Sequence, residues 1–232
     1  MSDFQRYAIY YLPDDRALAS FGAAWLGWDV EHGRDVAGLS VEQRAAMVAK
    51  ARVYGFHATL KPPFRLVEGA TADALQGPLT QFAAARAPVA LGGLCLTRLG
   101  GFLALVPVAE VLGITELAFD VVKTFDRFRR PADAAELSRR RASGLSARQD
   151  ALLMQWGYPY VADEFRFHLT LTDPLDTARL MKATEAVKTH LPKIARPFEI
   201  ASIALVGERT DGRFQMIQRY ALQGKAGSGG GI

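Results

Sequence analysis

Two short stretches of the sequence carry residue types suited to proton transfer, a histidine and a threonine separated by one apolar residue. They are His57-Ala58-Thr59 and His168-Leu169-Thr170. An unperturbed imidazole has a pKa of about 6.5, so at neutral pH one ring can accept a proton while another donates one. Two histidines with hydroxyl groups beside them therefore favour acid–base chemistry at a phosphoester.

These groups suit a reaction in which water attacks phosphorus. The neutral histidine would remove a proton from the water and the protonated one would donate to the leaving oxygen, each role contributing a rate factor of about 10²–10⁴. Thr59 and Thr170 would hydrogen-bond the remaining phosphate oxygens. The pair predicts a bell-shaped pH–rate profile whose pKa values belong to both rings together. The sequence leaves open which histidine is the base.

Both tripeptides lie in apolar runs typical of β-strands, Tyr54 to Leu60 and Phe165 to Leu171. Alternate side chains of a strand share a face, so each histidine and its threonine point to one face and their apolar neighbours to the core. Extending the polar face predicts four further groove residues: Gly55, Lys61, Arg166 and Thr172. The two cations would offset the charge of a phosphate.

The tripeptides occupy matching places in a duplicated unit of strand, proline, helix, strand, glycine turn and strand. After the first tripeptide come a helix from Thr71 to Arg86 and strands Val89–Thr97 and Phe102–Val108. After the second come a helix from Asp176 and strands Phe198–Val206 and Arg213–Leu222. This repeat predicts an α+β fold with two similar lobes, about 1–110 and 111–223, related by approximate two-fold symmetry around a central cleft.

The remaining segments have simpler signals. Arg6–Leu12 reads as a first strand, and Thr115–Phe128 as a helix with one apolar face. Capping boxes at 40–43 and 146–149 predict helices ending near Arg52 and Gly157. The segment 131–144 is expected to be helical or loose, and the glycine-rich tail 224–232 to be flexible.

Composition limits the setting and the substrate. The net charge of +4 suits an anionic ligand. A lone cysteine, Cys95, cannot form an internal disulfide, and no signal-peptide or membrane segment is evident, which together predict a cytoplasmic protein. Arginines cluster in mid-chain, as either a solvated helical face or a patch for phosphate or nucleic acid: Arg127, Arg129, Arg130, Arg139, Arg140 and Arg141.

A zinc site is the rival use of two histidines. The strand faces offer no good third ligand, and no H-E-x-x-H or cysteine cluster occurs elsewhere. His32 and His190 have the settings of structural residues, a loop and a helix C-terminus. Phosphate loops of the G-x-x-x-x-G-K-[ST] type, dinucleotide fingerprints and G-x-S-x-G elbows are also missing. We therefore expect catalysis without a metal or cofactor.

With its two H-x-T-L motifs in a duplicated unit, the sequence resembles the two-histidine (2H) phosphoesterase superfamily. The phrases RYAIYY (Arg6–Tyr11), YGFHATLKPPF (Tyr54–Phe64) and FRFHLTL (Phe165–Leu171) look more narrowly like a bacterial branch found with phosphonate-utilisation genes. The resemblance covers most of the chain. It implies a bilobed fold without metal, acting on cyclic phosphodiesters of nucleotides or ribose. It carries over His57, Thr59, His168 and Thr170, and in its narrower form it also supports Tyr54, Lys61 and Arg166 as substrate-binding residues.

Two other functions compete with the enzyme hypothesis. A binding module could keep the cleft and hold a nucleotide or RNA end without cleaving it, although intact histidine pairs argue against this. RNA end-processing or ligation would need a longer basic track, which the arginines supply only if they line the cleft. We expect a monomer acting on a small phosphodiester or nucleotide, away from membranes.

Overall fold

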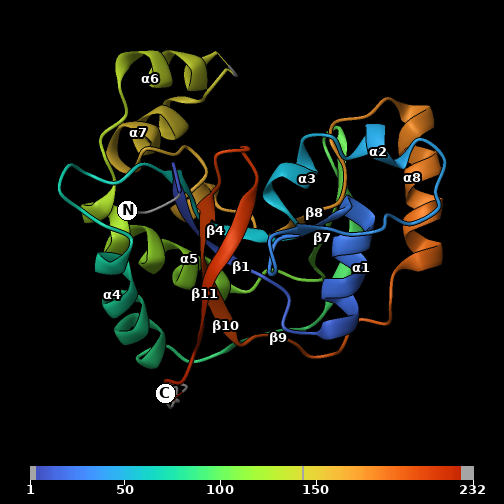
Figure 1. Cartoon of the computed structure of the whole chain (residues 1–232), viewed down its shortest axis with the longest axis horizontal. Helices are drawn as coiled ribbons and strands as arrows, with labels where there is room; N and C mark the ends of the chain where they lie inside the picture. Colours follow the sequence, from blue (N-terminus) through green and yellow to red (C-terminus); the bar gives the residue numbers. More distant parts are fainter. Residues whose placement is uncertain (1–3, 143, 226–232) are drawn as a thin grey trace.

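The computed structural model of the chain describes residues 4–142 and 144–225. Helices and strands are interleaved along the chain and the strands pair antiparallel, so the fold is α+β. Helices α4, α5, α6 and α7 lie on one side of the molecule, and α1, α2, α3 and α8 on the other (Figure 1). Within the described residues, no helix is long and apolar enough to cross a membrane. The predicted tail falls mostly on residues 226–232, outside the described residues.

The larger sheet has four antiparallel strands in the order β11-β10-β1-β4. They are β1 (Tyr7–Tyr11), β4 (Ala58–Phe64), β10 (Ser202–Glu208) and β11 (Phe214–Ala221). Every residue of β1 and β10 is buried, because these two strands lie in the middle of the sheet and are covered on both faces. Strand β4 lies at the edge of the sheet, next to β1.

Two smaller sheets complete the strand framework. One has the order β6-β7-β8, with β6 at Leu94–Leu99, β7 at Phe102–Pro107 and β8 at Leu169–Thr170. In the other, β5 (Val89–Leu91) pairs antiparallel with β9 (Phe198–Ile200), which joins equivalent strands of the two repeats.

The predicted boundary between lobes near residue 110 does not describe these sheets. The first H-x-T strand, β4, belongs to the sheet of the second hairpin, β10–β11, and the second, β8, pairs with β7 of the first hairpin. Local sequence patterns specify a strand and its buried face, whereas the partner strand is chosen by packing between distant segments. Each sheet is therefore built from both halves of the chain.

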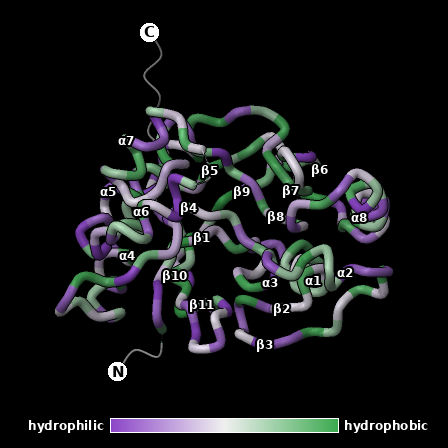
Figure 2. Tube along the Cα trace, turned by 90° about the horizontal axis from the view of Figure 1, so that it is seen from above, coloured by the Kyte–Doolittle hydropathy of each residue, from purple (hydrophilic) through white to green (hydrophobic). Residues whose placement is uncertain are grey.

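Helices cover the sheets through apolar faces. On one side lie α4 (Asp73–Ala84) and α5 (Leu112–Phe125), and on the other α1 (Arg16–Leu26) and α8 (Thr177–His190). Seen from above, α5 lies near β4, whereas α1 and α8 lie toward β7 and β8 (Figure 2). One large cluster of buried side chains connects these helices to the strands, including Trp25, Leu60, Val121, Leu169 and Leu205.

Several predicted elements have the expected form. The capping box before α7 (Ala147–Trp156) is complete: the Gln149 N–H donates to Ser146 Oγ, and the Ser146 N–H donates to Gln149 Oε1, both at 3.1 Å. Gly157 ends the helix with a φ of 72°. The arginine-rich segment forms α6 (Ala134–Arg141), capped by Asp133. Between α5 and α6 the chain makes a 3₁₀ turn, η1 (Asp126–Phe128).

Several predicted boundaries are wrong. The capping box at 40–43 does not form, because Gln43 adopts a left-handed conformation with a φ of 59°. Two short helices follow instead, α2 (Arg44–Met47) and α3 (Ala51–Tyr54). Tyr54 thus ends a helix, and β4 runs through Pro62-Pro63. A strand at the edge of a sheet tolerates proline because one side of it needs no N–H donors. The second H-x-T strand is shorter than predicted, and residues 162–164 form a 3₁₀ turn, η2 (Ala162–Glu164).

Candidate active site

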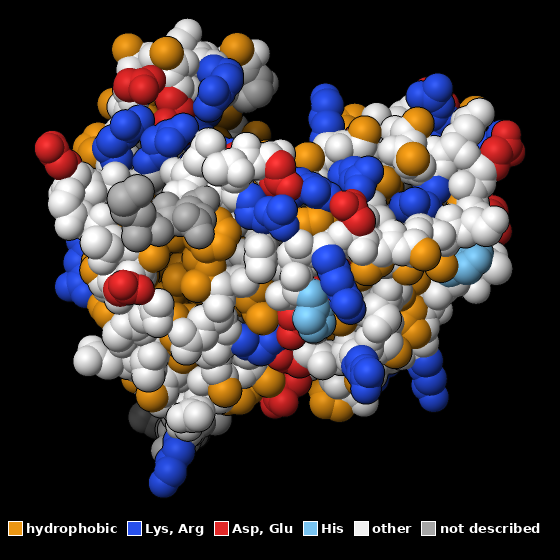
Figure 3. Space-filling model, in the orientation of Figure 1, with side chains coloured by type: hydrophobic (Ala, Val, Ile, Leu, Met, Phe, Trp, Pro, Cys, Tyr) orange, Lys and Arg blue, Asp and Glu red, His pale blue; other side chains and the backbone are white. Residues whose placement is uncertain are grey.

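A cavity of about 840 Å³ lies between β1, β4, α6 and the end of α7. Its lining includes both H-x-T threonines and one of the two histidines. The polar and aromatic residues that line it are Gln5, Arg6, Tyr10, Tyr54, His57, Thr59, Lys61, Phe64, Arg65, Arg129, Arg130, Asp133, Glu136, Arg139, Arg140, Trp156, Tyr158, Thr170 and Glu208. Figure 3 shows Lys and Arg side chains around an indentation beside the protruding α6–α7 region.

The local backbone fixes the ring of His57. Its Nδ1–H donates to the carbonyl oxygen of Gly55 at 2.9 Å, which leaves Nε2 unprotonated in the neutral ring. Nε2 accepts from the Thr59 hydroxyl at 3.0 Å. Gly55 has a φ of 76°, and a Cβ on it would overlap the side chain of Val30. Glycine is therefore required where the chain turns from α3 into β4.

The surroundings of His57 favour its neutral form. The Tyr10 ring stacks on the imidazole with 3.8 Å between centroids, and the Tyr54 ring lies 6.3 Å away. Burial lowers the pKa of His57 to about 4; the hydrogen bond to Gly55 opposes this shift, and the charge of His168 adds to it. His57 is thus neutral at pH 7, and Nε2 is the ring atom that carries the free lone pair.

His168 repeats the arrangement of His57 in the second half of the chain. Its Nδ1–H donates to the carbonyl oxygen of Arg166, also two residues earlier, at 2.8 Å. An aromatic ring, Phe102, lies 5.9 Å from the imidazole. His168 is not among the cavity-lining side chains, but Thr170 is, and the charge of His168 acts on His57. The two H-x-T tripeptides, which are far apart in the sequence, thus reach the same cavity through Thr59 and Thr170.

The predicted alternation of faces holds at both tripeptides. The apolar neighbours are buried in the main core: Phe56, Ala58, Leu60, Phe167, Leu169 and Leu171. The two histidines and two threonines are only partly buried. The polar faces of the two strands are thus directed away from the core, as expected.

The predicted face of Lys61 is wrong. Tyr10 pairs with Thr59 and Ile9 with Lys61, so Leu60 is an extra residue in β4 and forms a bulge. The bulge turns Lys61 to the core side, where its Nζ lies 3.3 Å from the Val122 carbonyl oxygen and 3.4 Å from Asp126 Oδ1. Burial lowers the pKa of Lys61 to about 8, and the Asp126 carboxylate limits that shift. The residue borders the cavity, but its ammonium group is bonded to α5 and η1.

Arg166 and Thr172 were predicted to line the groove as well, but neither residue lines the cavity. Arg166 is exposed and does not line the cavity; its contribution to the site is the carbonyl oxygen that holds His168. Thr172 is buried, and its hydroxyl accepts from the Leu103 N–H at 3.0 Å. Strand β8 contains only Leu169–Thr170, so the alternation of side-chain faces cannot be extended back to Arg166 or forward to Thr172.

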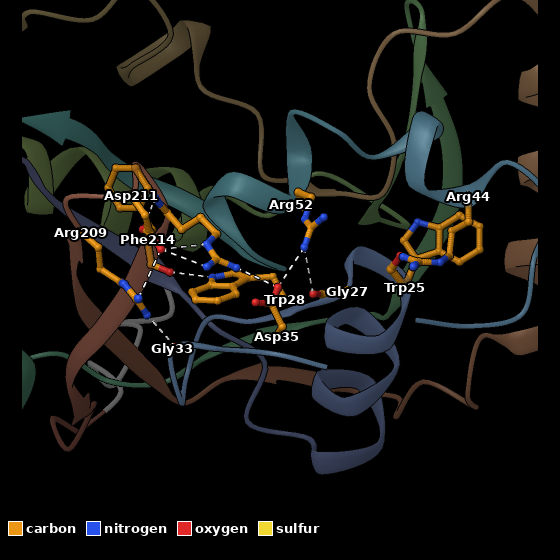
Figure 4. Close-up of polar contacts among 11 residues, drawn as sticks. Trp25, Gly27, Trp28, Gly33, Asp35, Arg44, Arg52, Arg209, Asp211 and Phe214 are labelled. Atoms are coloured by element: carbon orange, nitrogen blue, oxygen red, sulfur yellow. Dashed lines mark hydrogen bonds and ion pairs between the residues drawn. The ribbon is translucent and has the colours of Figure 1, made fainter. Parts of the chain in front are cut away.

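Tyr54 lines the cavity from the end of α3, and a polar network holds it there. Its ring stacks on Phe214 of β11 at 5.3 Å. Arg52, two residues before Tyr54, pairs with Asp35 at 3.0 Å, and Asp35 also pairs with Arg213 at 2.8 Å (Figure 4). Arg213 lies 4.0 Å above the ring of Trp28. These contacts join the loop bearing Tyr54 to the larger sheet.

Two features of the cavity were not predicted from the sequence. Arg6 and Glu208 form a bidentate ion pair on its wall, with both N···O distances at 2.6 Å. The Tyr10 hydroxyl is buried and has no hydrogen-bond partner among the described residues, although the ring lines the cavity. Both Arg6 and Tyr10 lie in an aromatic, β-branched run that looks like an ordinary core strand. Nothing in that pattern distinguishes them from packing residues.

The mid-chain arginines divide into two groups. Arg129, Arg130, Arg139 and Arg140 line the cavity. The others do not: Arg127 is exposed with its guanidinium over Phe128, and Arg141 pairs with Asp150 at 2.6 Å. The segment therefore supplies one set of arginines that lines the cavity and another set that lies outside it.

The remaining histidines have structural partners. His32 Nδ1 lies 2.8 Å from Asp29 Oδ2, and His190 Nδ1–H donates to the Ala186 carbonyl at 2.8 Å. Across residues 4–142 and 144–225, no group of three or more His, Cys, Asp or Glu side chains is arranged to hold a metal ion.

Comparison with known proteins gives one family match. The family described as "Protein of unknown function (DUF1045)" matches residues 59–215. Two curated relatives carry the name "Ribose 1,5-bisphosphate phosphokinase PhnN". The Janthinobacterium protein is 37% identical over 95% of this chain and 51% of its own length; the Laribacter hongkongensis protein is 39% identical over 74% and 40%. The chain thus spans about half the length of these relatives.

Several solved structures share a loose likeness over almost the whole chain. The structure of TT0787 from Thermus thermophilus has a TM-score of 0.46 and 13% identity, covering 95% of this chain and 100% of its own. Escherichia coli LigT complexed with 3′-AMP has a TM-score of 0.43 and 14% identity, covering 94% and 98%. A structure described as a phosphoesterase has a TM-score of 0.42 and 17% identity, covering 94% and 98%.

Proposed function

The chain belongs to the DUF1045 family, and we propose that it is a metal-independent phosphodiesterase that opens a cyclic phosphodiester. The supporting observation is the matched hydrogen bonding of the two histidine rings, whose H-x-T threonines line one cavity. Each ring donates its Nδ1–H to the carbonyl two residues earlier, which leaves each Nε2 for proton transfer. One of them, His57, has a pKa low enough to be a neutral base.

His57 takes the role of general base. Its Nε2 lone pair accepts a proton from water as the water oxygen attacks phosphorus. The hydrogen bond from Nδ1–H to Gly55 keeps the ring in the required tautomer and stabilises the charge it gains. In the free enzyme the Thr59 hydroxyl donates a hydrogen bond to Nε2. We expect this hydroxyl to turn and donate to a phosphate oxygen when substrate binds.

His168 takes the role of general acid. As the bond from phosphorus to the leaving sugar oxygen breaks, its electron pair stays on that oxygen, which accepts the proton from His168 Nε2. The products are a phosphomonoester and a free hydroxyl. His57 is then protonated and His168 neutral, and exchange with solvent restores both rings. Thr59 and Thr170 donate to the non-bridging oxygens.

Ribose is the sugar that we propose for the substrate. The curated relatives are named for a kinase acting on ribose 1,5-bisphosphate. Hydrolysis of ribose 1,2-cyclic phosphate 5-phosphate at the 2-oxygen yields ribose 1,5-bisphosphate, so a cyclic phosphodiesterase could supply that compound. Nucleoside 2′,3′-cyclic phosphates present the same five-membered ring and are the second substrate class to test. A role in phosphonate use remains a prediction.

The kinase activity in the relatives' name is not part of this proposal. The chain matches only about half of each relative, and its sequence has no G-x-x-x-x-G-K-[ST] loop to hold a nucleoside triphosphate. Two histidines and two hydroxyl groups suit hydrolysis, which needs a base, an acid and hydrogen-bond donors to phosphate.

The test is hydrolysis of both substrate classes by purified protein in EDTA. His57→Ala and His168→Ala should each lower kcat by about 10²–10⁴. His190→Ala is the matched control, because its ring is bonded to a helix carbonyl away from the cavity, and it should leave kcat unchanged. Turnover that either active-site variant retains in full would refute the mechanism. Saturable binding without turnover in wild type would favour the ligand-binding module instead.

A further inference from the structure

The cavity carries more positive charge than a single cyclic phosphodiester requires. Seven cationic side chains line it, against three carboxylates: Asp133, Glu136 and Glu208. A cyclic phosphodiester has one negative charge. Excess cations around an enclosed cavity raise the local concentration of anions and repel one another until an anion binds.

Most of these cations already have a carboxylate partner. Arg6 is bonded to Glu208, and Arg140 pairs with Glu136 at 2.8 Å. Arg129 pairs with Asp126 at 2.7 Å, and the ammonium of Lys61 lies near the same carboxylate. These four cations share three carboxylate partners within the protein and are therefore poor candidates to bind a new anion.

Three arginines remain available. Among the described residues, Arg139 has no ion-pair partner, and the guanidinium group of Arg65 contacts only the Gln5 carbonyl oxygen, at 3.4 Å. Arg130 is 3.9 Å from the Asp133 carboxylate, beyond hydrogen-bond distance. All three line the cavity.

The backbone places two of these arginines side by side. The Arg130 N–H donates to the Arg65 carbonyl oxygen at 2.8 Å, and Leu66 forms a β-bridge with Arg129. Arg139 follows on α6, just beyond the turn that begins at Arg130. Arg65 directly follows the last residue of β4, the strand that carries Thr59, and all three arginines line the same cavity as His57 and Thr59.

We propose that Arg65, Arg130 and Arg139 form a second anion site that binds a terminal phosphomonoester of the substrate. The preferred substrate is then a sugar phosphate with a cyclic diester at the histidines and a dianionic phosphate at the arginines. Guanidinium groups bind phosphate through paired, charge-assisted hydrogen bonds. This inference rests on the proposed function, because the histidines define where the first phosphate lies.

The test compares two ligands that differ only in the second phosphate, ribose 1-phosphate and ribose 1,5-bisphosphate, by calorimetric titration of the wild-type protein. The bisphosphate should bind about 10- to 100-fold more tightly, and the difference should shrink as salt is raised from 0.1 to 0.3 M. Equal affinities, or no binding of the bisphosphate, would overturn the proposal.

Two variants and a control locate the effect. Arg139→Gln and Arg130→Gln should each reduce the ratio of the two affinities by about 5- to 20-fold. Arg127→Gln is the matched control, since Arg127 belongs to the same segment but does not line the cavity, and it should keep the wild-type ratio. A ratio that falls equally in all three variants would show a general charge effect and overturn the assignment.

The two proposals can fail separately. If His57→Ala keeps the preference for bisphosphate while wild type cleaves no cyclic substrate, the second anion site stands and the phosphodiesterase activity does not. If wild type cleaves cyclic phosphates equally well with and without a 5-phosphate, the activity stands and the second site is wrong. Affinity that rises with oligonucleotide length, with no effect of a terminal phosphate, would replace the second site with an RNA-binding track.

Discussion

Lowering the pH from about 6.5 to about 4 should lower the free energy of unfolding through His57, because the pKa of this histidine in the folded protein is unusually low. The folded-state pKa of His57 is about 4, whereas an unfolded histidine titrates at about 6.5. Between these values the unfolded chain binds a proton that the folded chain does not, so stability falls as the pH drops through 6.5 and stops falling below about 4. At about 1.36 kcal/mol per pKa unit the full effect is about 3 kcal/mol, and partial solvent exposure of the ring reduces it to about 2 kcal/mol.

The measurement is urea unfolding of wild type and His57→Gln at pH 7, 6, 5 and 4. Wild type should lose about 2 kcal/mol more than the variant over this range, because both share every other titrating group. A ring-proton NMR titration of His57 gives the pKa directly. If the free energies of unfolding of wild type and variant fall in parallel with pH, and the NMR pKa of His57 is near 6.5, the account of His57 as a neutral base is refuted.

Three substitutions test other features of the site. Lys61→Met should leave the free energy of unfolding within about 1 kcal/mol of wild type, because methionine fills the same space and Asp126 keeps its arginine partner; a loss above about 3 kcal/mol on thermal unfolding would contradict this. Tyr10→Phe should be neutral or stabilising by about 1 kcal/mol, because it removes an unpartnered buried hydroxyl and keeps the stacked ring; denaturant unfolding decides. Gly55→Ala should cost about 2 kcal/mol or more and lower kcat, because its Cβ meets Val30 at a positive φ; full activity at wild-type stability would disprove this.

The two H-x-T tripeptides could be located from sequence because their signal is local. A strand has a side-chain period of two, and the apolar neighbours of His57 and His168 have only one face to bury against. The matching carbonyl contacts of the two rings follow from the same local geometry. The directions of the side chains within each tripeptide were therefore predictable from the sequence.

Lys61 shows where this reasoning fails. One extra residue in β4 reverses the face of every position beyond it, and nothing in the sequence marks Leu60 as a bulge. Thr172 fails for a related reason, because β8 ends at Thr170. Local periodicity predicts a side chain's direction only as far as the strand remains regular, and regularity depends on the neighbouring strand.

The exchange of strands between repeats has a consequence for how the site forms. Strand β4 completes the sheet that contains β10 and β11, and β8 completes the sheet that contains β7. Neither half of the chain therefore contains both an H-x-T strand and the hairpin sheet that holds it. The β5–β9 pair joins equivalent segments of the two halves and ties the sheets together. Burial is the main cause of the low pKa of His57, and the charge of His168 adds to it, so this pKa depends on residues from both halves of the chain.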